Sequence, residues 1–237
     1  MRLSLAPATL AAIGALFLSS TAQANGYGNV AYYGLRGSFV ITEDGSTHGQ
    51  VNFDYNEQYE DGFAAGAFVG WVLDSNFRLE GEGMYRSADI DDVIMIRDGL
   101  LSPPTPPGTR IDAGGDAQVG TAMVNLYYDL TFLESEILPW IGGGLGGAFV
   151  DYEIDATVPD PMDPFSTIQL LGAKDTTWVF AYQFMAGITF PIGQGMSMSA
   201  AYRFFQTQDF VYVDNWGEEF ETDLTQHSFD VSLQFHL

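Results

Sequence analysis

The chain of 237 residues contains no cysteine, so neither disulfide bonds nor thiol chemistry can contribute to its stability or activity. Its three histidines show no metal-ligand spacing. Lysine and arginine together number only 8, against 31 acidic residues, which gives a formal net charge of −23. This imbalance excludes the basic surface that nucleic-acid binding requires, and it favours cations or basic partners.

Long apolar runs are also absent, with one exception at the amino terminus. The chain begins Met-Arg, residues 3–18 are largely apolar, and residues 22–24 read Ala-Gln-Ala, a small-x-small cleavage pattern. We expect residues 1–24 to be a cleaved signal peptide and residues 25–237 to form one exported domain. A retained membrane helix is disfavoured because the apolar run is shorter than the ~20 residues that span a bilayer.

What the chain does contain is a series of segments in which apolar and polar residues alternate, as in Ser228–Leu237. Such a strand has one apolar face and one polar face. The predicted strands are residues 29–40, 62–73, 77–88, 118–132, 138–153, 177–191, 196–210 and 226–237. Three short connections alternate with four long ones, at residues 41–61, 89–117, 154–176 and 211–225. We therefore predict an all-β fold, an eight-stranded antiparallel up-and-down transmembrane β-barrel with short periplasmic turns and four long extracellular loops.

The polar faces of these strands carry charges of both signs. A charge that faces lipid at mid-depth costs ~2–4 kcal/mol, so the charged faces are expected to point into the barrel. The predicted lumen charge network comprises Arg36, Arg78, Glu80, Glu82, Arg86, Asp129, Arg203 and Asp230. Because isolated buried ions are costly and eight strands enclose little more than their own side chains, we expect ion pairs and a plugged lumen. The alternative is that these charges line a narrow, water-filled pore.

Aromatic residues are expected to form two bands at the membrane surfaces. We place Trp71 and Trp140 at the short-turn side of the barrel. The predicted band at the long-loop side comprises Tyr85, Trp178, Phe210 and Tyr212.

Five stretches resemble the small outer-membrane β-barrel family of opacity proteins and related surface antigens, which is similar in fold to the OmpA-type transmembrane barrel. They are Tyr33-Gly34-Leu35-Arg36-Gly37, Val124-Asn125-Leu126-Tyr127-Tyr128-Asp129, Pro139-Trp140-Ile141-Gly142-Gly143-Gly144-Leu145-Gly146, Ala181-Tyr182-Gln183-Phe184-Met185-Ala186-Gly187-Ile188 and Ala201-Tyr202-Arg203-Phe204-Phe205. The resemblance implies a monomeric barrel in the outer membrane of a Gram-negative bacterium. The partners it implies are outer-membrane lipid, lipopolysaccharide, the barrel-assembly machinery, and host or surface ligands. Many members end in phenylalanine, whereas this chain ends Phe-His-Leu.

Most of the acidic residues fall in or beside the four long connections. One interpretation is that they only keep an exposed surface hydrated. The other is that clustered carboxylates bind Ca²⁺, since hard oxygen ligands suit this ion. The densest candidates for cation binding are Asp151, Glu153, Asp155, Asp214, Glu218 and Glu219, which do not match the EF-hand spacing. No other cofactor is expected.

Little in the sequence indicates catalysis. His227 and Ser228 are adjacent on a predicted strand, so their side chains point to opposite faces and cannot form a base-nucleophile pair. Glu80 and Glu82 share a face, but nearby lumen arginines explain them more simply. We therefore expect a non-enzymatic structural or surface-antigen role that presents acidic loops outward. The alternative function is a narrow porin that passes small, preferably cationic, solutes.

Overall fold

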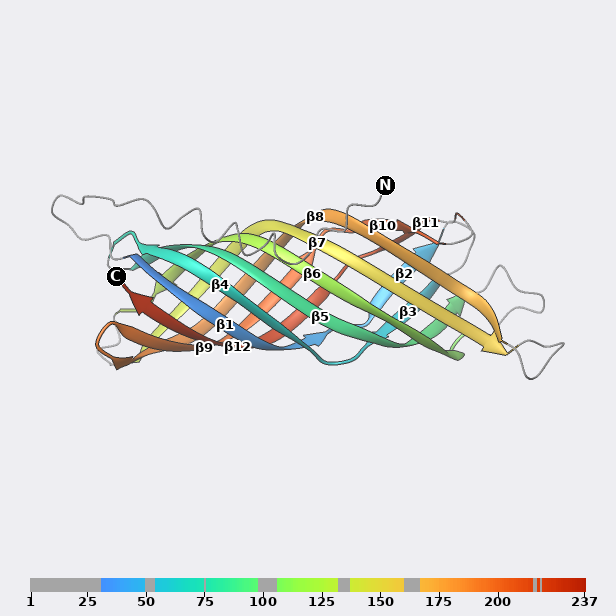
Figure 1. Cartoon of the computed structure of the whole chain (residues 1–237), viewed down its shortest axis with the longest axis horizontal. Coiled ribbons are helices and arrows are strands. Elements are labelled where there is room, and N and C mark those ends of the chain that lie inside the picture. Colours follow the sequence, from blue (N-terminus) through green and yellow to red (C-terminus); the bar gives the residue numbers. More distant parts are fainter. Residues whose placement is uncertain are drawn as a thin grey trace, which may run out of the picture.

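The protein forms a long, tilted β-barrel (Figure 1). The structure is a computed structural model that describes residues 31–49, 54–74, 76–97, 106–131, 137–159, 167–214, 217 and 219–237. The predicted signal peptide lies outside these residues. Within the described part of the chain, no helix is long and apolar enough to cross a membrane.

Eight strands close into one antiparallel ring, here called the first ring. Around the barrel the order is β5, β4, β1, β12, β9, β8, β7 and β6, and pairing of β6 with β5 completes the circle. The bounds are β1 Ala31–Thr42, β4 Gly62–Val72, β5 Phe77–Arg97, β6 Arg110–Asp129, β7 Leu138–Pro159, β8 Thr167–Gly193, β9 Met196–Thr207 and β12 Thr225–His236. The prediction of an eight-stranded, antiparallel, up-and-down barrel is confirmed.

The sequence suggested that the long connections are irregular loops. The structure shows instead that they contain further β-structure. The strands β5 to β8 continue well past their predicted ends, and the first and fourth long connections contain further strands of their own. These are β2 Gly45–Gly49, β3 Asp54–Tyr59, β10 Phe210–Val213 and β11 Glu219–Thr222. The predicted boundaries were wrong here because turn-forming residues and charges interrupt the apolar alternation that was used to recognise strands.

These extra strands build a second ring beyond the first. It consists of β2, β3, β10 and β11 together with the far halves of β5 to β8. The strand β3 pairs with β5, β2 with β3, β11 with β2, and β10 with β11. One bridge, Ala173 to Asp214, links β8 to the residue that follows β10. In Figure 1 the second ring lies at the end of the barrel opposite the carboxyl terminus.

The short turns lie at the other end and are closed by local hydrogen bonds. In the β4–β5 turn, the Asp74 carboxylate accepts hydrogen bonds from the backbone N–H groups of Asn76 and Phe77, at 2.8 and 2.9 Å. An Asp side chain commonly closes a turn in this way. The β8–β9 turn ends at Gly195, whose φ of 72° suits glycine because it has no Cβ.

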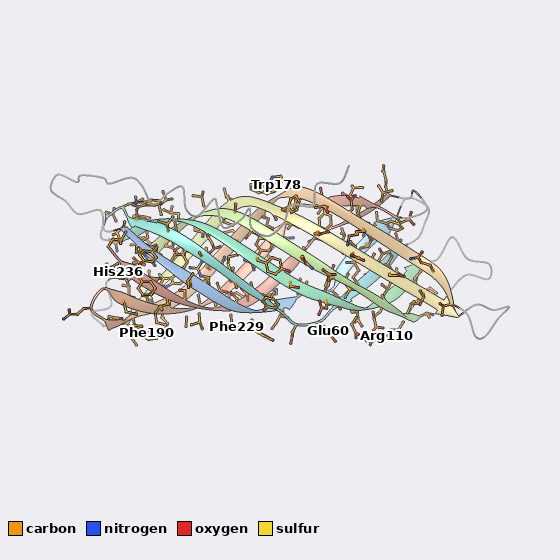
Figure 2. All side chains as sticks on the ribbon, viewed as in Figure 1. Glu60, Arg110, Trp178, Phe190, Phe229 and His236 are labelled. Atoms are coloured by element: carbon orange, nitrogen blue, oxygen red, sulfur yellow. The ribbon has the colours of Figure 1, made fainter. Side chains whose placement is uncertain are left out.

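The outer wall of the first ring is apolar. Leu35, Leu145, Trp178, Phe184 and Phe229 are all more than half exposed and come from four different strands. Figure 2 shows Trp178 and Phe229 pointing away from the barrel. Apolar surface of this extent is what a lipid-facing belt requires.

Three of the predicted girdle residues point inward instead. Trp140, Phe210 and Tyr212 are buried inside the barrel, whereas Tyr85 and Trp178 are exposed on its outer wall. The prediction was wrong for the first three because an aromatic residue can lie on either the lipid-facing or the lumen-facing side of a strand. Only the register of the closed barrel decides which face it occupies.

Candidate functional site

The lumen of the first ring is crossed by charged side chains from five strands. Period-2 alternation on β5 aims Arg78, Glu80, Glu82 and Arg86 inward, and all four are buried. Facing strands contribute the other charges. These are Arg36 on β1, Asp129 on β6, Arg203 on β9 and Asp230 on β12.

Arg203 is the centre of the largest group of ion pairs. Its Nη1 and Nη2 donate to the two carboxylate oxygens of Glu82 at 2.6 and 2.9 Å, and its Nε donates to Asp230 at 2.8 Å. Arg36 pairs with Glu82 as well, and with Glu80 at 3.3 Å. Such bidentate, charge-assisted bonds are the strong ones in proteins, and here they fix side chains from four strands.

A second ion pair lies nearer the short turns. Arg78 donates through Nε and Nη2 to the two oxygens of Asp129, both at 2.8 Å. Its guanidinium also lies 5.0 Å from the ring centre of Tyr127 and 5.8 Å from that of Trp140. The cation is therefore held by a carboxylate and by aromatic faces.

Neutral polar side chains complete the hydrogen bonding of these charges. Gln183 accepts from Arg203 Nη1 at 2.7 Å and donates to Asn125 Oδ1 at 2.7 Å. The hydroxyl of Tyr127 donates to Glu80 at 2.9 Å. Sequence reasoning did not assign roles to Gln183 and Tyr127. The sequence signal that could have placed them in the lumen is their alternation with apolar neighbours that face outward.

Arg86 differs from the other three lumen arginines. It is fully buried, but its Nε and Nη1 have no hydrogen-bond partner. Its guanidinium carbon lies 4.4 Å from the ring centre of Phe205, and Nη2 lies 3.9 Å from the sulfur of Met84. The structure thus brings seven of the eight predicted network residues into ion pairs and leaves Arg86 against apolar and aromatic groups.

The second ring is filled mainly by aromatic and aliphatic side chains. Tyr152 and Tyr212 have ring centres 4.9 Å apart, and Tyr212 stacks on Phe220 at 5.5 Å. The hydroxyls of Tyr55 and Tyr212 are hydrogen-bonded to each other. These four residues come from β3, β7, β10 and β11, so the layer connects strands on all sides of the ring.

The predicted cation-binding residues lie at the second ring but do not converge. Asp151, Glu153 and Asp155 follow one another on the outer face of β7, where Glu153 pairs with Lys174 and the other two accept hydrogen bonds from Thr176 and Gln169. Asp214 is buried at the bridge to β8, Glu219 is exposed, and Glu218 lies outside the described residues. Among the described side chains, no three His, Asp or Glu residues form a group that could hold a metal ion. Ca²⁺ binding stays a prediction.

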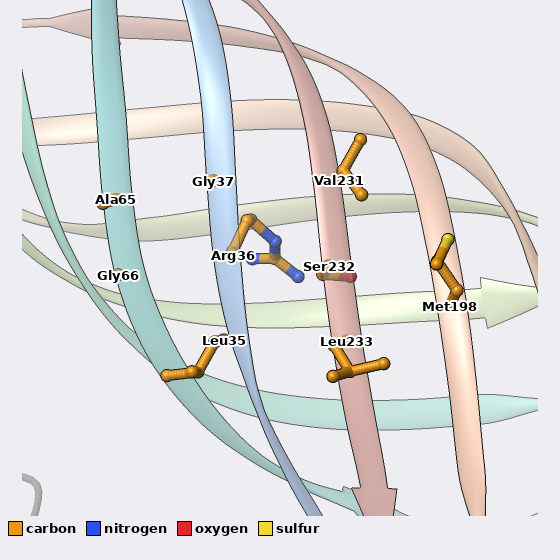
Figure 3. Close-up of a pocket in the computed structure, with 9 residues that line it drawn as sticks. All are labelled: Leu35, Arg36, Gly37, Ala65, Gly66, Met198, Val231, Ser232 and Leu233. Atoms are coloured by element: carbon orange, nitrogen blue, oxygen red, sulfur yellow. The ribbon is translucent and has the colours of Figure 1, made fainter.

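One shallow hollow marks the outer wall of the first ring (Figure 3). Its volume is about 450 Å³, and Leu35, Ala65, Met198, Val231 and Leu233 contribute to its lining. Gly37 contributes no side chain, and a Cβ there would meet nothing within 4 Å. The hollow lies in the apolar belt, and the lumen residue Arg36 also contributes to its lining.

Known proteins share this architecture. A family model described as the outer membrane protein beta-barrel domain matches residues 8–236. An uncharacterized protein of Brucella abortus is 26% identical over 159 residues, which cover 65% of this chain and 55% of that protein. An outer membrane protein of Gluconacetobacter diazotrophicus is 26% identical over 152 residues, which cover 62% of this chain and 36% of that protein. The chain thus spans about half or less of the length of these curated relatives.

Solved structures are similar in fold alone. The outer membrane protein OprG from Pseudomonas aeruginosa superposes with a TM-score of 0.53 at 13% identity, covering 88% of this chain and 97% of that chain. Neisserial surface protein A gives a TM-score of 0.46 at 10% identity, covering 86% and 96%. The closed ring, its apolar outer wall and the family-model match to residues 8–236 all indicate an outer-membrane β-barrel. The chain belongs to the outer membrane protein beta-barrel domain family, and its location is the outer membrane of a Gram-negative bacterium.

Proposed function

We propose that this protein is a sealed, non-enzymatic barrel whose working part is the acidic outer surface of the second ring. In this role the first ring anchors the protein in lipid, and the second ring stands outside the membrane as a surface structure. The observation that supports the proposal is that bonded side chains cross the lumen at two levels. The Arg203–Glu82 group fills the first ring, and the layer of Tyr55, Tyr152 and Tyr212 fills the second.

The form of the second ring supports a presenting role. Its outer face carries carboxylates at fixed positions on paired strands, for example Asp89, Asp116 and Glu153, which follow one another across β5, β6 and β7. Like charges in such a row repel one another, so they do not serve stability. A surface of this kind attracts cations and basic partners and repels anionic ones.

The arrangement of candidate catalytic groups supports a non-enzymatic role. Glu80 and Glu82 are both buried and paired with arginines, which accounts for their place in the lumen without a catalytic role. Ser228 is buried and donates to Asp230 at 2.8 Å. His227 lies on the other face of β12, where its Nδ1 is 2.5 Å from the hydroxyl of Tyr202.

Single-channel recording in a planar bilayer tests the sealed lumen. We expect no stable conductance from refolded protein whose gel mobility changes on boiling. The charge-neutral double variant Arg203→Ser/Glu82→Ser opens the first level, and Tyr212→Ala opens the second. Each alone is expected to stay silent, while the combination conducts. Stable, cation-selective steps from the unaltered protein would instead establish the porin alternative.

Labelling on intact cells tests the presented surface. Because the chain has no cysteine, each introduced cysteine is a unique reporter. A membrane-impermeant maleimide is expected to label Glu153→Cys on intact cells and Gln194→Cys, in the β8–β9 turn, only after the outer membrane is opened. Phe229→Cys, in the apolar belt, is the matched control that should stay unlabelled. Labelling of Gln194→Cys on intact cells would show that the short turns face outward, and would refute the proposed role of the second ring as a presented surface.

A further inference from the structure

One buried carboxylate in the second ring differs from all those in the first. Glu57 on β3 is completely inaccessible to solvent. Its register partner on β2 is Gly45, and the carboxylate lies over this glycine. A Cβ on Gly45 would stand 3.1 Å from Glu57 Oε2, so the absence of a side chain is what makes room for the acid.

Neutral hydroxyl groups hold this carboxylate. Thr47 Oγ1 donates to Glu57 Oε1 at 2.7 Å, and the Tyr59 hydroxyl donates to Oε2. Within the described part of the chain, no arginine or lysine pairs with Glu57. By contrast, Glu80 and Glu82 each have an arginine partner. Burial without a cation strongly disfavours a charged carboxylate.

Among the described side chains, the groups that act most strongly on Glu57 include no cation. The surrounding titratable and polar groups are Thr47 on β2, Tyr55 and Tyr59 on β3, Tyr152 on β7, Tyr212 on β10, and Asp223 between β11 and β12. Burial raises the pKa of Glu57, and the negative charge of Asp223 raises it further. Hydrogen bonds from Tyr59 and Thr47 act in the opposite direction without cancelling the effect.

The hairpin that carries Glu57 is held at a weak seam. Among the described residues, β2 meets β11 through two register pairs, Gly49 with Phe220 and His48 with Glu221. On its other side the hairpin is paired with β5 through six register pairs, which two irregularities interrupt, so the contact with β11 is its weaker edge. Segments with so few cross-strand bonds open at lower free energy than a continuous ladder such as β7–β8.

We propose that Glu57 is a pH-dependent latch that holds the β2–β3 hairpin closed in the second ring while it is uncharged. A carboxyl group whose folded pKa is raised contributes stability that is complete at low pH and is lost as the pH rises through that pKa. The hairpin is therefore tight in acid and loosens toward alkaline conditions. The inference rests on the proposed function, because it concerns regulation of the surface that the second ring presents.

Two measurements on full-length protein in lipid nanodiscs test the latch between about pH 5 and about pH 9, a range above the usual glutamate pKa. The first is the carbon-13 shift of the Glu57 carboxyl group, which gives its titration midpoint. The second is hydrogen exchange of the β2 and β3 amides, corrected for the intrinsic effect of pH. We expect a midpoint above the ordinary range. Protection should fall by up to about tenfold per pH unit between the usual glutamate pKa and that midpoint, as one proton requires, and should level off above it.

Two variants separate the latch from general effects of charge. Glu57→Gln keeps the shape of the protonated acid and is expected to make protection of β2 and β3 independent of pH. Glu60→Gln removes the same charge from the exposed residue that follows β3, and should leave the pH dependence intact. An ordinary midpoint, or a raised midpoint without a change in protection, overturns the latch. The midpoint and the amide protection do not depend on whether the lumen conducts or on which residues maleimide labels. Conductance and labelling therefore test the proposed function independently of the latch.

Discussion

Arg203 and Glu82 meet inside the barrel through two parallel hydrogen bonds of 2.6 and 2.9 Å, although 121 positions separate them in sequence. Glu82 also pairs with Arg36, so one carboxylate contacts two buried guanidinium groups, and Glu80 and Asp230 supply further negative charge beside them. The pairing joins β5 to β9 and β1 across the lumen rather than along the wall. It therefore links strands that are not neighbours in the ring, and in the proposed sealed barrel it also fills the lumen at this level.

Removal of the Glu82 charge should strongly destabilise the barrel. Glu82→Gln leaves Arg203 and Arg36 short of a carboxylate in a buried site, which costs about 3–5 kcal/mol. Urea unfolding in detergent micelles, followed by the gel shift on boiling, measures the loss. Glu60→Gln, at an exposed position, should change stability by no more than about 0.5 kcal/mol. Equal effects of the two variants would show that the network does not stabilise the fold.

Replacement of Arg86 should affect the stability of the barrel in the opposite direction to replacement of Arg203. Arg86→Met removes two buried donors that have no partner, so stability should stay the same or rise by up to about 3 kcal/mol. Arg203→Met, which is the matched change, should lose about 3–5 kcal/mol because it strands Glu82 and Asp230. The same urea titration compares them. Similar losses for both would mean that Arg86 has a carboxylate partner in the membrane.

The boundary between lipid and water should lie between the two rings. Leu35→Arg places a charge on the outer wall of the first ring and should cost ~2–4 kcal/mol. Val213→Arg places the same charge on the outer wall of the second ring, where water solvates it, and should change stability by no more than about 0.5 kcal/mol. Refolding yield and urea midpoint in lipid vesicles report the difference. A large cost at Val213 would put the second ring in the bilayer.

Gly45 should be intolerant of a side chain because of Glu57. Gly45→Ala brings a methyl group to 3.1 Å from Glu57 Oε2, so the buried carboxylate must move by a few tenths of an ångström and the hairpin amides should exchange faster. Gly37→Ala, where a Cβ meets nothing within 4 Å, is the control and should leave exchange unchanged. Hydrogen exchange followed by mass spectrometry resolves the two segments. Unchanged protection in Gly45→Ala would show that the carboxylate is not packed over the glycine.

Alternation along the strands could be predicted from the sequence, because it depends only on the period of two that every strand obeys. The number of strands in the first ring and the positions of the short turns followed from it. The inward face of β5 is an example, since Arg78, Glu80 and Glu82 can share one side only if their apolar neighbours face lipid. The same periodicity could not place Trp140 or Tyr212, because aromatic residues occur on both faces.

The sequence by itself therefore determined the fold class, the compartment and the face of each charged strand residue, since a charge has a strong preference between lipid and lumen. Only the tertiary structure decided which arginine meets which carboxylate, because that depends on the register and tilt of strands that are far apart in sequence. It also decided that Glu57 is buried without a cation and that the long connections form a second ring. Pairing between distant segments, unlike alternation within one segment, leaves no local pattern in the chain.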